Sequence, residues 1–213
     1  NKPFIKGLTT NPTLMKKAGI NNYKDFCLDI LSEINDKPIS FEVFSDDFDE
    51  MIVQAREIAS WADNVYVKIP IMNTKKEMCY KHVEKLVNEK VKINITAIMT
   101  TKQVRDVSKV LSADVPSYVS IFAGRIADTG IDPLKIIIES LDILKSNKMA
   151  EIIWAGPREL LNVFQASDIG CHIITVTPDI INKFKLIGYD LDQYSLDTVE
   201  MFYNDATSAG YKI

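Results

Sequence analysis

Short β-branched and apolar runs alternate along this chain with segments in which apolar residues recur at helical spacing. Such alternation is typical of repeated βα units around a parallel sheet. Seven of the runs are predicted to form strands: Phe4–Thr9, Ile39–Phe44, Asn64–Ile69, Val91–Ile98, Ser117–Phe122, Ala150–Ala155 and Cys171–Val176. The pattern therefore predicts an α/β fold with a parallel sheet.

The segments between these runs carry apolar stripes. One stripe comprises Tyr23, Phe26, Cys27, Ile30, Leu31 and Ile34, and another comprises Met78, Cys79, His82, Val83, Leu86 and Val87. Residues that recur at intervals of three and four share one face of a helix. We therefore expect His82 to be a helix-face residue and not a catalytic one. Further helices are predicted at Asp47–Ala62, Thr101–Ser112, Pro133–Ser146, Glu159–Ala166, Pro178–Ile187 and Leu196–Ala209.

The βα repeat predicts a (β/α)8 TIM barrel. A chain of 213 residues suits one such barrel and has no linker or break in composition, which favours a single domain, 1–213. Seven strands cannot close an eight-stranded barrel, because closure couples strand number to tilt and shear. The chain opens almost directly into a strand. The sequence therefore predicts that the first β-strand is missing, or that its place is filled from elsewhere.

Composition and cysteine content limit the partners of the chain. With 46% hydrophobic residues, 25% charged residues and a net charge of −4, it is typical of a soluble globular protein. It has no apolar run of about 18 residues and no cluster of basic residues, which argues against membrane and nucleic-acid partners. Three distant cysteines argue against a metal site. Cys27 and Cys79 are expected to be small buried hydrophobes, as in a protein of the reducing cytoplasm.

Lys68 is the residue with the clearest chemical implication. It interrupts the run Val65–Pro70, which otherwise suits a strand that is covered on both faces. It also lies near the carboxyl end of that strand, where barrels place their catalytic groups. Burial favours a neutral amine, which can attack a ketone carbonyl to form a Schiff base. The alternative is a lysine whose stem packs while its amine reaches water.

Polar residues at the ends of neighbouring strands are candidates for the rest of such a site. Aldol chemistry through a Schiff base needs proton transfers, for which Glu42 and Thr96 could hold a relay water. Asn11 and Asn94 could hydrogen-bond the hydroxyls of a ketose. Each residue also has a simpler interpretation, because threonine and asparagine often end strands or cap helices and Glu42 could face outward.

Arg125 and Arg158 follow the runs Ser117–Phe122 and Ala150–Ala155. Arginine binds phosphate through two parallel charge-assisted hydrogen bonds, and neighbouring helix N-termini supply further N–H donors. We therefore predict a phosphate at one end of the substrate. The alternative is a surface ion pair with Asp128 or Glu159.

Four segments, Gly7–Thr13, Val67–Pro70, Asn94–Ile98 and Ser120–Ile126, closely resemble the transaldolase family in their order and residues. The likeness covers nearly the whole chain and is closest to the short transaldolases and the fructose 6-phosphate aldolases. It implies a Schiff base on Lys68 without a metal or organic cofactor. It also implies catalytic roles for Lys68, Glu42 and Thr96 and substrate contacts from Thr9, Asn11, Asn94, Ser120, Phe122, Arg125 and Arg158.

Glu42 and Phe122 help to separate the subfamilies within this resemblance. Transaldolases have glutamate and phenylalanine there, whereas the short aldolases tend to have glutamine and tyrosine. The resemblance therefore implies transfer of a dihydroxyacetone unit from sedoheptulose 7-phosphate or fructose 6-phosphate to an aldose phosphate, as in the pentose phosphate pathway. Cleavage of fructose 6-phosphate by the same lysine is the first alternative.

Two departures from the family pattern favour a third interpretation, a catalytically impaired barrel that binds sugar phosphates. Nothing ahead of Gly7 supplies the family's first strand or its acid/base aspartate, and Gly156 stands where the family usually has a phosphate-contacting serine. Arg158 keeps the charge. Members of the short subfamily commonly form symmetric rings, so the resemblance also implies a homo-oligomer in which Tyr189–Ile213 could pack on a neighbour.

Overall fold

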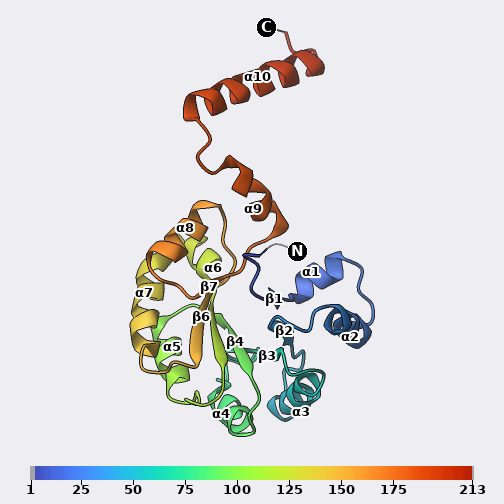
Figure 1. Ribbon diagram of the computed structural model, residues 1–213, viewed down its shortest axis with the longest axis vertical. Helices are drawn as coiled ribbons and strands as arrows, with labels where there is room; N and C mark the ends of the chain where they lie inside the picture. The colour runs from blue at the N-terminus through green and yellow to red at the C-terminus, as the bar shows by residue number, and fades with distance from the viewer. Residues whose placement is uncertain (1–2, 213) are drawn as a thin grey trace. The chain divides into compact units, whose positions relative to one another are not determined.

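The computed structural model describes residues 3–212, and these contain one parallel sheet. Each strand pairs with the next one along the chain, so the order in the sheet is β1 to β7. The sheet curls, with helices on its outer side, into part of a (β/α) barrel (Figure 1). The predicted fold class is confirmed. The strands are β1 (Leu8–Thr9), β2 (Ile39–Glu42), β3 (Val65–Pro70), β4 (Ile93–Ile98), β5 (Ser117–Ile121), β6 (Ala150–Trp154) and β7 (Ile173–Ile174).

The two outer strands of this sheet are its shortest. Only Leu8–Thr9 of the predicted run Phe4–Thr9 forms a strand, and only Ile173–Ile174 of the predicted run Cys171–Val176 does so. Within residues 3–212, β1 pairs only with β2 and β7 only with β6, and no strand precedes β1. A strand with one neighbour has half the ladder hydrogen bonds of an inner strand, which accounts for the short pairing.

The contacts within the chain divide it into two compact units, and the division falls between Thr175 and Val176 in the sequence. In the first unit, the short helices α1 and α6 were not predicted, because five or six residues are too few to display an apolar stripe. The single domain, 1–213, stays a prediction. The helices of the first unit are α1 (Pro12–Lys17), α2 (Tyr23–Glu33), α3 (Phe48–Ala59), α4 (Tyr80–Asn88), α5 (Thr101–Ser108), α6 (Ala123–Ala127), α7 (Pro133–Leu144) and α8 (Leu161–Asp168).

The second unit consists of α9 (Pro178–Asn182), a 3-10 helix η1 (Lys183–Leu186) and α10 (Leu191–Ala209). Helix α10 begins five residues earlier than predicted, because the Asp190 side chain caps it by accepting a hydrogen bond from the Gln193 amide at 2.8 Å. No residue of α10 is buried. None of the helices in the described part of the chain combines the length and apolar character needed to cross a membrane.

Alternation along the strands separates an apolar face from a polar one. Residues such as Phe41, Val67 and Ile95 are fully buried in the hydrophobic core. Successive side chains of a strand point to opposite faces, so the residues between them form the other face. Cys27 and Cys79 are buried in the same core, as predicted, and burial raises the pKa of both thiols to about 12. The polar face carries the candidate site.

Candidate active site

Lys68 and Glu42 form a buried ion pair on the polar face. They are register partners in the β2–β3 ladder, so their side chains point to the same side of the sheet. Lys68 Nζ lies 2.7 Å from Glu42 Oε1, and the two side chains are only 11% and 9% exposed. The sequence left open a solvated Lys68 amine and an outward-facing Glu42. The structure has neither arrangement.

Thr10 completes the surroundings of this pair. Lys68 Nζ donates to the Thr10 carbonyl oxygen at 2.8 Å and to Thr9 Oγ1 at 3.3 Å. The Thr10 hydroxyl donates to the second carboxylate oxygen of Glu42 at 2.8 Å. The Lys68 amine therefore has three acceptors, one of them a carboxylate that can take its proton. Sequence reasoning missed Thr10 because part of its contribution is a backbone carbonyl, which every residue has.

A second polar group links β2, β4 and β5 on the same face. Asn94 Nδ2 donates to Ser40 Oγ at 2.9 Å, and Ser120 Oγ donates to Asn94 Oδ1 at 2.7 Å. All three residues are buried. Asn94 and Ser120 were candidates from the sequence, whereas Ser40 was not. Its position two residues before Glu42 on one strand was the signal that could have identified it.

Thr96 lies at an irregularity in β4. The register between β4 and β5 shifts between Ile95 and Ile98, and Ala97 adopts a left-handed backbone conformation with φ 62°. A bulge of this kind changes the direction of the neighbouring side chains. Thr96 Oγ1 is buried and has no hydrogen-bond partner among residues 3–212. An unpaired buried hydroxyl costs about 1–3 kcal/mol, so this group is available to a substrate or to a water molecule.

Asn11 and Thr9 lie where β1 ends. The Asn11 side-chain oxygen caps α1 by accepting hydrogen bonds from the amides of Thr13 at 2.8 Å and Leu14 at 3.2 Å. The capping role considered for Asn11 is therefore present, and its Nδ2 group is the part left for a ligand. Thr9 is exposed and contributes its hydroxyl to the Lys68 contacts.

The two candidate phosphate-binding arginines lie after β5 and β6, and both are exposed. Arg158 forms a two-point ion pair with Asp128, in which Nε lies 2.9 Å from Oδ1 and the terminal nitrogen contacts Oδ2. These hydrogen bonds hold the pKa of Asp128 below its usual value. The ion pair considered for Arg158 is therefore present. No carboxylate in the described residues lies within ion-pair distance of Arg125.

The backbones that carry these arginines approach each other closely. A Cβ atom on Gly124 would lie 1.7 Å from the Gly156 carbonyl oxygen, so glycine at position 124 is required by the packing. Gly156 itself has φ 67°, a conformation that L-residues rarely adopt. Phe122, half-buried, precedes α6 at this point. The left-handed backbone conformation of Gly156 therefore favours glycine over the serine that the resemblance implies at this position.

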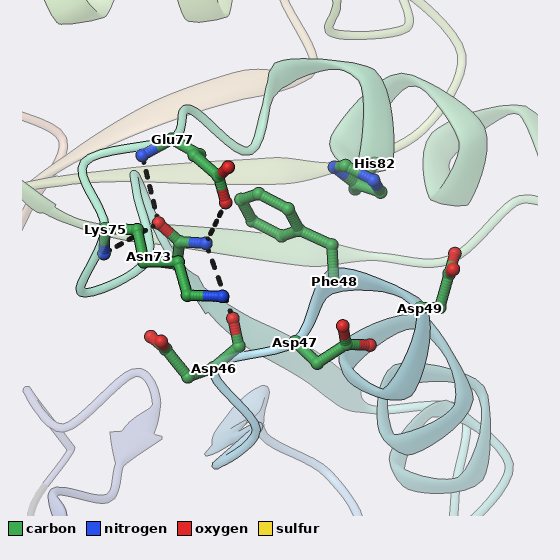
Figure 2. A pocket seen from close by; sticks show the side chains of 8 residues that line it. All are labelled: Asp46, Asp47, Phe48, Asp49, Asn73, Lys75, Glu77 and His82. Atoms are coloured by element: carbon green, nitrogen blue, oxygen red, sulfur yellow. Dashed lines mark hydrogen bonds between the residues drawn. The ribbon is translucent and has the colours of Figure 1, made fainter.

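A separate hollow lies between the loops that follow β2 and β3, lined by Asp46, Asp47, Phe48, Asp49, Asn73, Lys75, Glu77 and His82 (Figure 2). Asn73 holds its own loop through a 2.6 Å bond to the Glu77 carboxylate, and Thr74 ties that loop to Asp46 through two bonds of 2.7 Å. His82 lies on α4, as predicted, and stacks on Phe48 with ring centroids 4.2 Å apart. Four carboxylates make this hollow unfavourable for phosphate.

Comparison with known proteins gives consistent matches. The family model described as Transaldolase/Fructose-6-phosphate aldolase matches residues 1–213. A probable transaldolase of Thermoanaerobacter sp. (strain X514) is 36% identical over 214 residues, which cover 98% of this chain and 90% of that protein. A probable transaldolase of Clostridium kluyveri is 39% identical over 174 residues, which cover 81% and 76% of the two chains. A probable transaldolase of Methanococcus maripaludis (strain C5) is 36% identical over 184 residues, which cover 84% and 80%.

Proposed function

Because this chain belongs to the transaldolase/fructose-6-phosphate aldolase family, we propose that it transfers a dihydroxyacetone unit from a ketose phosphate to an aldose phosphate through a Schiff base on Lys68. The observation that carries this proposal is the buried Lys68–Glu42 pair. A lysine enclosed with a single carboxylate can lose its proton to that carboxylate when a ketone approaches. The resulting neutral amine is the nucleophile that a Schiff base requires.

The proposed reaction proceeds in balanced steps. The Lys68 amine adds to the ketose carbonyl, and the carbinolamine loses its hydroxyl as water after Glu42 returns a proton. The iminium then accepts the electron pair of the C3–C4 bond of the ketose. This bond breaks as the C4 hydroxyl gives its proton, through a relay water, to the Glu42 carboxylate. An aldose leaves and a three-carbon enamine stays on Lys68. Attack of the enamine on an acceptor aldehyde forms the new bond, and hydrolysis of the iminium releases the product and restores the lysine.

Thr96 is proposed to hold the relay water for these proton transfers. Its unpaired hydroxyl supports the role, because a bound water would satisfy it. Asn94 is proposed to donate to a ketose hydroxyl through the second Nδ2 hydrogen, which its bond to Ser40 leaves free. Ser120 is proposed to accept from a ketose hydroxyl, because its own hydrogen is donated to Asn94. Thr9, Asn11 and Phe122, on the ends of β1 and β5, are proposed to line the same substrate.

The phosphate is proposed to bind on the β5–β6 side, at Arg125. This arginine is exposed and has no ion-pair partner among residues 3–212, so binding an anion breaks no existing pair. Arg158 is proposed to contribute less, because its guanidinium must first leave Asp128.

Two further properties are proposed from family membership. We propose a cytoplasmic homo-oligomer, and the exposed apolar side chains of α10 support the oligomer, among them Leu191, Val199, Phe202 and Tyr203. Sedimentation measurements on the full chain test this part, and a monomer at micromolar concentration would contradict it.

The activity is tested by supplying fructose 6-phosphate with and without erythrose 4-phosphate. A transaldolase gives sedoheptulose 7-phosphate and glyceraldehyde 3-phosphate when both sugars are present and almost no free dihydroxyacetone when the acceptor is absent. Steady release of dihydroxyacetone without the acceptor would instead identify an aldolase. A folded chain that does neither would be the impaired, sugar-phosphate-binding barrel. The Lys68→Ala variant is the control for contaminating activity.

A further inference from the structure

The hydrogen-bond ladder between β1 and β2 stops one step before Glu42. It contains bonds from the Leu8 amide to the Pro38 carbonyl at 2.9 Å and from the Thr10 amide to the Ser40 carbonyl at 3.1 Å. In a parallel ladder, the next bonds would join the Glu42 amide to the Thr10 carbonyl and the amide of residue 12 to the Glu42 carbonyl. Residue 12 is proline, which has no N–H, and it begins α1.

Both of these missing bonds have substitutes. The Thr10 carbonyl accepts from Lys68 Nζ at 2.8 Å in place of the Glu42 amide. The Glu42 amide donates to the Tyr23 hydroxyl at 2.8 Å, and the same hydroxyl lies 3.3 Å from the Glu42 carbonyl, to which it donates. One phenol therefore satisfies both backbone groups of Glu42, and the Thr10 carbonyl is left to face the lysine.

The Tyr23 ring is held in place by other aromatic residues. Tyr23 is the first residue of α2, and its ring meets the edge of Phe44 at 4.5 Å and of Phe41 at 6.4 Å between centroids. Trp61 lies at 6.3 Å. Burial raises the pKa of the Tyr23 hydroxyl above its usual value, so the group stays protonated and can donate. Its two bonds to Glu42 therefore have a fixed geometry.

We propose that Tyr23 is a positioning residue. Its hydroxyl substitutes for the missing part of β1 by bonding both backbone groups of Glu42. It thereby keeps the Glu42 carboxylate and the Thr10 carbonyl in contact with Lys68. The functional half of this inference rests on the proposed Schiff base. Tyr23 itself does not touch substrate. Without its hydroxyl, the Glu42 amide would compete with Lys68 for the Thr10 carbonyl.

Two measurements on Tyr23→Phe, with Tyr80→Phe as the matched control, test this role. Tyr80 is half-buried on α4 and also loses only a hydroxyl. The first measurement is hydrogen exchange, in which Tyr23→Phe should speed exchange of the Glu42 amide about tenfold. The Val67 amide, bonded to the Lys92 carbonyl at 2.9 Å, should be unchanged. Equal exchange at Glu42 in Tyr23→Phe and the original chain would overturn the positioning role, whether or not the protein is an enzyme.

The second measurement is the rate at which borohydride traps the three-carbon adduct on Lys68 when fructose 6-phosphate is supplied. Tyr23→Phe should slow trapping about tenfold without changing the sugar concentration at half-saturation. In a chain that already carries Glu42→Gln, Tyr23→Phe should slow trapping much less, because the residue acts through Glu42. The inference would be overturned if the fold-losses in trapping rate of Tyr23→Phe and Glu42→Gln multiply fully in the double variant. It would also be overturned if Tyr23→Phe changes only the sugar concentration at half-saturation. A wild-type chain that is never trapped would instead contradict the proposed function and leave the exchange result to decide the role of Tyr23.

Discussion

The two sides of the carboxyl rim of the sheet differ in burial and in charge. On the β2–β3 side, Lys68 and Glu42 are enclosed, and the loops that follow these strands, together with the first turn of α3, carry four carboxylates around one hollow. On the β5–β6 side, Arg125 and Arg158 are exposed. The enclosed side has the groups needed for covalent chemistry, and the open side has the groups needed to bind an anion. If the substrate is the proposed phosphorylated ketose, this difference favours an orientation with its carbonyl at Lys68 and its phosphate turned away from the acidic hollow.

Burial also determines how much a substitution should change the protein. A buried ion pair that loses one partner leaves an uncompensated charge, whereas an exposed pair contributes little because water screens it. We therefore expect the largest effects on the β2–β3 side and small, substrate-dependent effects on the β5–β6 side. Equal effects on the two sides would remove the basis for the proposed orientation.

The largest change is expected for Glu42→Gln. The amide keeps the shape of the side chain but cannot take the Lys68 proton, so kcat/KM for fructose 6-phosphate should fall by about a hundredfold or more. Asp49→Asn, which neutralises an exposed carboxylate of the nearby hollow, is the control and should stay within about twofold. Steady-state kinetics measure both. A loss as large for Asp49→Asn would mean that the acidic loops, and not the buried carboxylate, matter for the reaction.

Asn94→Ala should have the next largest effect, on stability as well as rate. The change removes two buried hydrogen bonds and leaves Ser40 and Ser120 without these partners, which should cost about 2–4 kcal/mol of the free energy of unfolding. Urea denaturation measures the cost. Asn88→Ala, at an exposed position in the last turn of α4, is the control. A cost below about 1 kcal/mol for Asn94→Ala would show that this buried group is not rigidly held.

On the open side, Arg125→Ala should raise KM for fructose 6-phosphate about tenfold, and Arg158→Ala only two- to threefold, because Asp128 already occupies the Arg158 guanidinium. Neither variant should change trapping of dihydroxyacetone, which has no phosphate. Asp128→Asn frees Arg158 and should lower KM slightly. The reverse order of the two arginine variants would assign the phosphate to Arg158.

The smallest effect is expected between the two sides, on β4. Ala97 has φ 62°, which costs an L-residue about 1 kcal/mol and glycine almost nothing. Ala97→Gly should therefore leave the stability unchanged or raise it by up to about 1 kcal/mol, measured by the shift of the urea midpoint. A fall of more than about 1 kcal/mol would indicate that the Ala97 methyl group contributes packing that outweighs the backbone strain.

The sequence predicted the parts of this protein that depend on periodicity. The inner strands follow from short apolar, β-branched runs, and the longer helices follow from spacings of three and four. The place of Lys68 inside an apolar strand predicted a packed stem, whereas the burial of its amine was left open. The β1 and β7 runs were predicted too long, because the length of an edge strand depends on its partners. Helices α1 and α6 were missed because short helices carry little pattern.

The contacts that surround Lys68 were the least accessible to sequence reasoning. The Thr10 carbonyl and the Tyr23 hydroxyl come from segments 58 and 45 residues away in the chain, and they reach the site only because β1 leaves the ladder at Pro12. Tyr23 was correctly assigned to a helix stripe, but a stripe does not distinguish a ring that packs from a ring that also donates. An ion pair between Arg158 and Asp128 was considered from the sequence. The sequence could not show whether Arg158 binds this carboxylate or is free to bind a phosphate, because the two residues are 30 positions apart.

The central claim is the Schiff base on Lys68, and trapping tests it most directly. The chain would be treated with fructose 6-phosphate and borohydride and then analysed by intact mass and peptide mapping, beside Lys68→Ala and Lys92→Ala. Lys92 is a suitable control because its amine is committed to the Asp63 carbonyl at 2.6 Å. The account predicts a three-carbon adduct on Lys68 that persists in Lys92→Ala and vanishes in Lys68→Ala. A folded chain with no adduct, or with an adduct on another lysine, would contradict it.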